Sequence, residues 1–152
     1  MKFAKSIICL LLALNWTLSS VTAQTEASPY NTDDSKIALQ GYSPISYLDL
    51  GLAQRGAKAY KSEHEGLKYY FTSAEQKSKF DAAPEKYLPQ FGGWCATGIA
   101  VGAKFRTDPH KFLVKDGKYY LFLYDLEVDA KELWLSDEKG MEAKAKKNWK
   151  QM

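Results

Sequence analysis

An acidic residue followed by glycine stands twice between β-rich runs, and this repeated turn limits the possible folds more than any other feature. The first turn, Glu65-Gly66, lies in the run 58–72, and the second, Asp116-Gly117, lies in the run 112–124. Glycine readily adopts the positive φ angle of a tight turn, so each run predicts an antiparallel β-hairpin. The last strand, 119–124, is apolar on both faces, which predicts that it is covered on both sides. We expect both hairpins to join one sheet.

Helical signals lie before, between and after the hairpins. Ser43-Pro44 is typical of an N-cap with proline in the first turn. Ser73 is followed by a glutamine three residues later, a capping-box pattern that predicts the start of a helix. Pro84 breaks or restarts this helix. Apolar residues recur at helical spacing over 126–134 and again over 141–149. Without a parallel βαβ pattern, this order predicts an α+β fold, an antiparallel sheet built from hairpins with several short helices packed on it.

The first 23 residues have the pattern of a secretory signal peptide. Two lysines precede an apolar run from Ile7 to about Trp16, and Val21-Thr22-Ala23 fits the small-residue rule of a cleavage site. The apolar run is shorter than the roughly 20 residues that span a bilayer, so we expect cleavage after Ala23 and no stable membrane anchor. The predicted organisation is a signal peptide over 1–23, a flexible leader over 24–36 and one domain over 37–152, periplasmic or secreted.

The charge of the mature chain is nearly balanced. Removing Lys2 and Lys5 with the signal leaves 19 basic residues against 18 acidic ones. This balance does not favour nucleic acid as a partner. A cluster of lysines near the C-terminus is interpreted as the solvated face and dipole partner of a last helix; its members are Lys144, Lys146, Lys147 and Lys150.

Cys95 is the only thiol of the chain after signal cleavage, and it lies in the stretch FGGWCATG, 91–98. A single cysteine forms no internal disulfide, although exported proteins commonly carry them. The glycines at 92 and 93 predict a sharp backbone turn. Cys95 is then a small buried apolar residue, a partner in a disulfide to another chain, or a thiol kept for metal or reactivity. The chain lacks the GxSxG, HExxH and CxxC motifs and a phosphate-binding glycine loop.

A metal ion is one use of the few soft ligands in the chain. Thiolate and imidazole suit copper or zinc, and the two histidines are His64, at the predicted tip of the first hairpin, and His110, on a helical turn predicted to open at Asp108-Pro109. If a metal ion such as copper binds, we expect Cys95, His64 and His110 to ligate it. A cysteine–histidine nucleophile pair is the alternative use of the same residues.

The run from Ile37 to Trp149 resembles the YHS-domain family, in particular its small exported members. The matching pieces, in chain order, are ALQGYSPISY from Ala38, YFTS from Tyr70, Phe80, PEKY from Pro84, Pro89, GGWCA from Gly92, DP at Asp108, DGKYYL from Asp116 and KNW from Lys147. The resemblance implies a small α+β domain and a link to metal, often copper. Family members found beside metal transporters look like Tyr-Phe-Cys-Ser followed by a second cysteine. Thr72 and Gln76 stand at those two positions here, so a two-cysteine site is not carried over.

Three functions are compatible with the sequence. The first is an exported, non-enzymatic binding module for a metal ion or a small ligand. The second is an enzyme or redox partner that uses the Cys95 thiol, which a partly exposed sulfur with a lowered pKa would favour. The third is a structural or interaction domain, which a sulfur packed among apolar atoms would favour. A histidine nitrogen close to the sulfur would favour metal binding.

Overall fold

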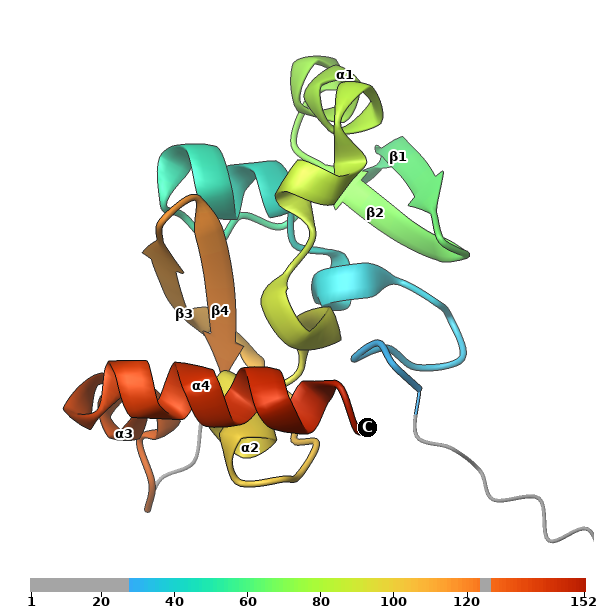
Figure 1. Ribbon diagram of the computed structural model, residues 1–152. Coiled ribbons are helices and arrows are strands. Elements are labelled where there is room, and N and C mark those ends of the chain that lie inside the picture. Colours follow the sequence, from blue (N-terminus) through green and yellow to red (C-terminus); the bar gives the residue numbers. More distant parts are fainter. Residues whose placement is uncertain (1–27, 124–126) are drawn as a thin grey trace, which may run out of the picture.

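The computed structural model describes residues 28–123 and 127–152 and has an α+β fold, as the sequence predicts. Figure 1 shows the first hairpin and α1 at one end of the molecule, with the second hairpin and α2 to α4 at the other. Within the described part of the chain, no helix is both long and apolar enough to cross a membrane. The elements are, in order, η1 (Ala38–Gly41), η2 (Ser46–Leu50), β1 (Ala57–His64), β2 (Leu67–Phe71), α1 (Ala74–Ala82), η3 (Pro84–Tyr87), η4 (Gln90–Gly93), α2 (Ala96–Ala100), β3 (Asp108–Lys115), β4 (Lys118–Phe122), α3 (Ala130–Ser136) and α4 (Glu138–Trp149).

Strand β4 is shared by two hydrophobic cores. Successive side chains of a strand point to opposite faces, and here each face belongs to a different core. The first core contains Ala38, Leu39, Ile45, Tyr47, Leu67, Tyr69, Phe71, Phe80, Tyr87, Tyr119 and Leu121. The second core contains Phe91, Cys95, Ala96, Ile99, Ala100, Tyr120, Phe122, Ala130, Trp134 and Ala145. This division confirms the prediction of a strand covered on both sides.

Both predicted hairpin turns are present. In the first hairpin His64 pairs with Leu67, and in the second Lys115 pairs with Lys118. All four turn residues have positive φ, at 49° and 76° in the first turn and at 52° and 69° in the second. These are the angles of a two-residue turn whose twist matches that of the strands it joins. The acidic-glycine signal therefore located both turns correctly.

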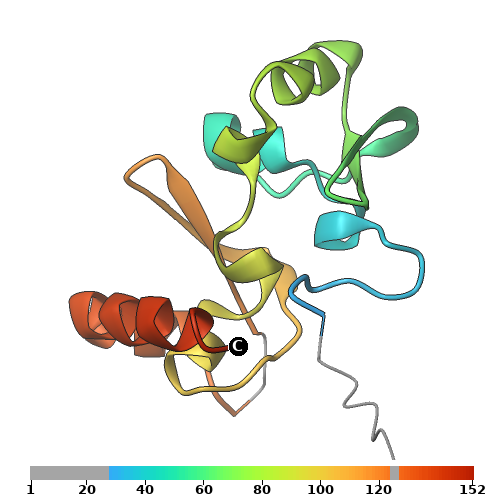
Figure 2. The same cartoon turned by 45° about the vertical axis from the view of Figure 1, so that its right-hand side comes forward.

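The expectation that the hairpins form one sheet is wrong. They form two separate two-stranded sheets, and the view of Figure 2 shows the hairpins well apart. The reason lies at their open edges, because the backbone of Ile37 bridges to Lys68 of β2 and that of Cys95 bridges to Leu121 of β4. Short irregular segments thus occupy the edges at which the hairpins would otherwise meet. As a result, α1 packs on the first hairpin, whereas α3 packs on β3 and α2.

The predicted helix starts have mixed outcomes. The Ser73 side chain caps α1 by accepting a hydrogen bond from the Gln76 amide, and helical turns follow Ser43-Pro44 into η2. The helical turn expected at Asp108-Pro109 is wrong, since β3 begins there. Asp108 pairs with Phe122, and its carboxylate accepts from the backbone amide of His110 within a bulge of the strand. The Asp-Pro cap signal therefore marks a local side-chain turn inside a strand.

The last two helices are capped by aspartates. Asp129 accepts hydrogen bonds from the first amides of α3, so this helix starts at residue 130; part of the predicted range 126–134 lies outside the described residues. Asp137 caps α4 by accepting from the amide of Gly140. That glycine thus lies inside the first turn of α4 rather than before it.

The chain before η1 packs on the domain from Ser28 onward. The side-chain amide of Asn31 is buried and donates to the Gly93 carbonyl at 2.9 Å and to the Thr107 hydroxyl at 3.0 Å. The Asn31 backbone amide donates to the Gly92 carbonyl at 2.9 Å. This packed segment differs from the flexible leader expected over 24–36, because one buried asparagine can hold an otherwise polar stretch. The predicted signal peptide, 1–23, and the start of the leader lie outside the described residues.

Candidate functional site

The Phe91–Gly93 turn brings the N-terminal segment against the second core. Its three residues have φ angles of 54°, 59° and 81°, the left-handed region that L side chains rarely adopt. Gly92 also lies against the backbone of Pro29, since a Cβ there would lie 2.1 Å from the Pro29 carbonyl oxygen. The glycines therefore provide both the predicted turn and room for a crossing chain.

Cys95 follows this turn as the N-cap of α2. Its sulfur accepts a hydrogen bond from the Gly98 amide at 3.4 Å, and its side chain is 1% exposed within the second core. A nucleophilic or redox thiol needs access and a thiolate-stabilising environment. This sulfur is instead sheltered by apolar neighbours and used to cap a short helix.

The two histidines lie on the two hairpins, each beside an aromatic ring. His64, at the end of β1, packs edge-on against Phe80 with ring centroids 6.1 Å apart, and its Nε2 lies 4.0 Å from the Glu85 carboxylate. His110, in β3, packs edge-on against Tyr42, and its Nε2 lies 3.2 Å from the Tyr42 hydroxyl.

The structure does not gather the three predicted metal ligands into one group. Across residues 28–123 and 127–152, no three His, Cys, Asp or Glu side chains are placed to hold a metal ion together. Cys95 belongs to the second core, His64 contacts a ring of the first core, and His110 lies at the surface beside Tyr42. A metal site from these residues stays a prediction that this arrangement does not support.

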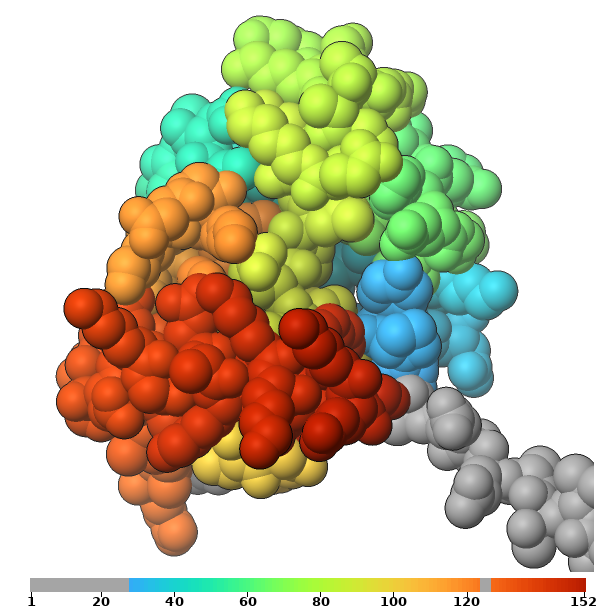
Figure 3. All heavy atoms as spheres, in the orientation of Figure 1, coloured from blue at the N-terminus to red at the C-terminus, as the bar shows by residue number. Residues whose placement is uncertain are grey.

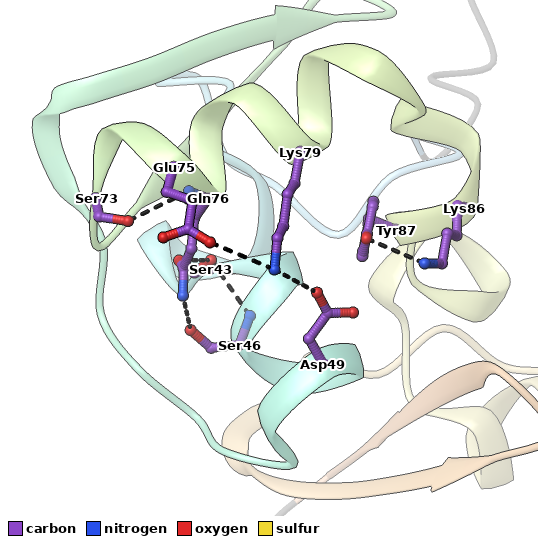
Figure 4. Close-up of polar contacts among 9 residues, drawn as sticks. All are labelled: Ser43, Ser46, Asp49, Ser73, Glu75, Gln76, Lys79, Lys86 and Tyr87. Atoms are coloured by element: carbon purple, nitrogen blue, oxygen red, sulfur yellow. Dashed lines mark hydrogen bonds and ion pairs between the residues drawn. The ribbon is translucent and has the colours of Figure 1, made fainter.

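Gln76 anchors a buried network of polar side chains (Figure 4). Its Oε1 accepts from the Ser43 hydroxyl at 2.7 Å and from the Thr72 amide at 3.1 Å, and its Nε2 donates to the Ser46 hydroxyl at 3.0 Å. The Ser46 hydroxyl donates in turn to Gln54 at 2.8 Å. Buried polar groups are stable when they are paired in this way. Gln76 thus joins α1 to the chain around η2, and Thr72 contributes only its backbone amide to this network.

A cavity of about 500 Å³ lies where the N-terminal segment, the chain before α2 and the end of α4 meet. Figure 3 shows the hollow between these segments, coloured blue, olive and red. Its walls are mainly apolar and combine leucine and proline side chains with four aromatic rings, those of Tyr30, Tyr69, Phe91 and Trp149. This volume and lining are typical of sites that bind small molecules. A neighbouring hollow of about 750 Å³ is more open and is lined largely by charged and polar side chains.

Three rings of the cavity wall are held by specific contacts. The Tyr30 hydroxyl donates to the Glu65 carboxylate, and this hydrogen bond raises the pKa of Tyr30. The rings of Phe91 and Trp149 meet edge-on with centroids 6.0 Å apart. Edge-on aromatic pairs add to the stability gained from burial, so the aromatic wall is organised before any ligand arrives.

The charged side chains that line the cavity are both lysines, Lys146 of α4 and Lys150, the C-cap residue of that helix. Lys146 pairs with Glu142 at 2.5 Å, and this hydrogen bond holds the pKa of Glu142 below its usual range. Lys150 has no carboxylate within ion-pair distance among the described residues. The mouth of an apolar cavity therefore carries an unneutralised positive charge.

Comparison with protein families, with curated proteins and with solved structures finds no match for this chain. Sequence reasoning did not find the cavity either, although it singled out the C-terminal lysines as a solvated face. The available signal was the position of Lys146 and Lys150 near Trp149, one helical turn apart.

Proposed function

We propose that this chain is an exported binding module that takes up a small, largely apolar molecule in the cavity between the N-terminal segment and α4. The observation that carries this proposal is the aromatic and aliphatic lining of a 500 Å³ space. Burial of apolar surface contributes about 25 cal/mol per Å², so such a wall favours a ligand that is mostly hydrocarbon.

The alternatives drawn from the sequence have weaker support. Copper binding would need ligands that meet, and Cys95, His64 and His110 have separate surroundings. Thiol chemistry would need an accessible sulfur, and that of Cys95 is buried. The YHS resemblance supports a small α+β module, which is compatible with a binding role.

An uncharged fluorescent probe, N-phenyl-1-naphthylamine, tests the proposal. We expect its emission to rise on binding to the purified protein. Gln90 lines the cavity, so Gln90→Phe should fill part of the space and weaken binding, whereas Gln151→Phe, at an exposed position outside the lining, should leave it unchanged. Melting curves would show that both variants are folded. No binding to the wild-type protein, or equal binding to both variants, would overturn the proposal.

The export part of the proposal rests on the N-terminal sequence. Cleavage after Ala23 would give a chain that begins at Gln24. The intact mass of the protein recovered from outside the cytoplasm measures this directly. A full-length, membrane-extracted species would contradict it.

A further inference from the structure

We infer that the ligand of this cavity is an amphipathic anion, with an apolar body inside and a carboxylate or similar acidic head at Lys150. This inference rests on the proposed function and adds the chemical class of the ligand. It starts from the contrast between the lining, which is apolar, and the mouth, where the charged side chains of the lining are lysines.

The positive charge at the mouth is only partly neutralised. The charge of Lys146 is balanced by Glu142 at 2.5 Å, whereas Lys150 has no carboxylate at ion-pair distance within the described ranges. Lys104 adds a third ammonium, 5.7 Å from the ring centroid of Trp149, and donates to the Ser28 carbonyl beside the N-terminal wall. Among the side chains that line the cavity, positive charge therefore exceeds negative charge.

Other charges near the mouth do not reverse this sign. The C-terminal end of a helix carries about half a negative elementary charge, which is less than the single charge of Lys150. Glu65, the carboxylate bound by the Tyr30 hydroxyl, lines the neighbouring hollow rather than the cavity. An acidic head at the mouth would therefore meet a net positive potential, while an ammonium head would be repelled.

The shape of the site fits one head and one body. Lys146 lies in the last turn of α4 and Lys150 is the C-cap residue one turn later, and Trp149 between them lines the same cavity. A flexible lysine ammonium at the rim can follow a head group while its hydrocarbon stem extends the apolar wall. The partly exposed rings of Tyr30 and Trp149 remain available to the apolar body.

Three eight-carbon probes with different heads test the inference by displacement of N-phenyl-1-naphthylamine from the purified protein. Octanoate, 1-octanol and octylammonium share one apolar body and differ in charge. We expect octanoate to bind about two- to fivefold more tightly than octanol, the range of an exposed ion pair, and octylammonium to bind most weakly. Raising the salt concentration should reduce the advantage of octanoate. Acetate, which has the head without the body, should not displace the probe.

Lys150→Gln identifies the residue responsible. It should remove most of the octanoate advantage and leave octanol binding within about twofold. Lys144→Gln is the matched control, because Lys144 lies on the same helix, is exposed and does not line the cavity. Octanol binding as tightly as octanoate, or a Lys150→Gln variant that keeps the octanoate advantage, would overturn the inference and leave the proposed function standing. If N-phenyl-1-naphthylamine binds and none of the three eight-carbon probes displaces it, the inference is overturned and the proposed function stands. No binding of N-phenyl-1-naphthylamine itself would overturn both.

Discussion

Replacing Gly92 by alanine should detach the N-terminal segment from the domain. The new Cβ would lie 2.1 Å from the Pro29 carbonyl oxygen and 3.3 Å from Cη2 of the Trp149 ring. Carbon and oxygen atoms do not approach to 2.1 Å without a bond, so the Pro29 backbone must move. Movement of this segment breaks the bond from the Asn31 amide to the Gly92 carbonyl and strains that from the Asn31 side chain to Gly93.

The size of the effect follows from two contributions. Residue 92 has a φ of 59°, and a left-handed conformation costs alanine about 1–2 kcal/mol, offset by about 0.4–1 kcal/mol because alanine restricts the unfolded chain. The two hydrogen bonds of Asn31 add about 1 kcal/mol each. We therefore expect Gly92→Ala to lower the free energy of unfolding by about 2–4 kcal/mol.

Gly117→Ala is the matched control for this experiment. Gly117 has a φ of 69°, and a Cβ there would meet no atom within 4 Å. It therefore keeps the backbone contribution and lacks the contact with a crossing chain, so its expected cost is about 1 kcal/mol. Denaturant unfolding of both variants measures the difference, and amide exchange at Asn31 reports whether the segment is released. Equal destabilisation by the two changes, with Asn31 still protected, would refute the packing of Pro29 on this turn.

Three further predictions concern the buried polar and aromatic groups. Gln76→Leu removes the acceptor of the Ser43 hydroxyl and the Thr72 amide, so it should lower the free energy of unfolding by about 2–4 kcal/mol. The control is Glu75→Gln, at an exposed neighbouring position, which should change the free energy of unfolding by less than about 0.5 kcal/mol. The Cys95 thiol is 1% exposed, so an aromatic disulfide reagent should modify it only as fast as the protein opens; rapid labelling of the native protein would contradict the burial. Burial raises the pKa of four tyrosines above the ordinary value of 10.0, so these phenols stay neutral in the fold while the unfolded chain ionises. These residues are Tyr47, Tyr69, Tyr119 and Tyr120. Their contribution to stability is complete below pH 10.0 and is lost as the pH rises through their folded-state pKa values, and the pKa of Tyr120 in the fold is about 12. An unfolding midpoint in urea that does not fall above pH 10.0 would contradict this prediction.

The elements that the sequence predicted correctly are those defined by contacts within a few residues. The turns at Glu65-Gly66 and Asp116-Gly117 depend on φ angles of the turn residues themselves. The cap of α1 depends on a hydrogen bond between Ser73 and Gln76, three residues apart. Such signals are complete in a short window of sequence. The helical turn predicted at Asp108 also depended on neighbouring residues alone, and it was wrong. The Asp108 carboxylate does accept from a nearby backbone amide, but it does so inside a strand.

The arrangement of the hairpins depended on contacts that leave no periodic pattern. A single bridge from Ile37 occupies the edge of β2, and a single bridge from Cys95 occupies the edge of β4. Neither residue lies in a run that alternates apolar and polar residues, so the sequence pattern does not predict that either one pairs with a sheet edge. Two apolar hairpins then favoured one sheet in the prediction, whereas each hairpin packs against its own helices and β4 contributes side chains to both cores.

The candidate site was equally dependent on contacts between distant segments. Its walls come from the N-terminal segment, η1, β2, the chain before α2 and the end of α4. Scarcity of thiol and imidazole directed the sequence-based search to Cys95 and the two histidines, yet the scarce residues have separate surroundings. Lys150 looked like part of a solvated helix face, and only the position of Pro29 shows that it borders a cavity.

Four of the residues singled out in the sequence hold segments of the fold together. Ser43 and Gln76 share a buried hydrogen bond, Gly92 admits a crossing chain, and Cys95 caps α2 while its backbone bridges to β4. Each of these residues helps to hold two segments of the chain together, so its substitution should lower stability. Ligand preference should instead follow the cavity rim, where Lys150 has no carboxylate partner among the described residues.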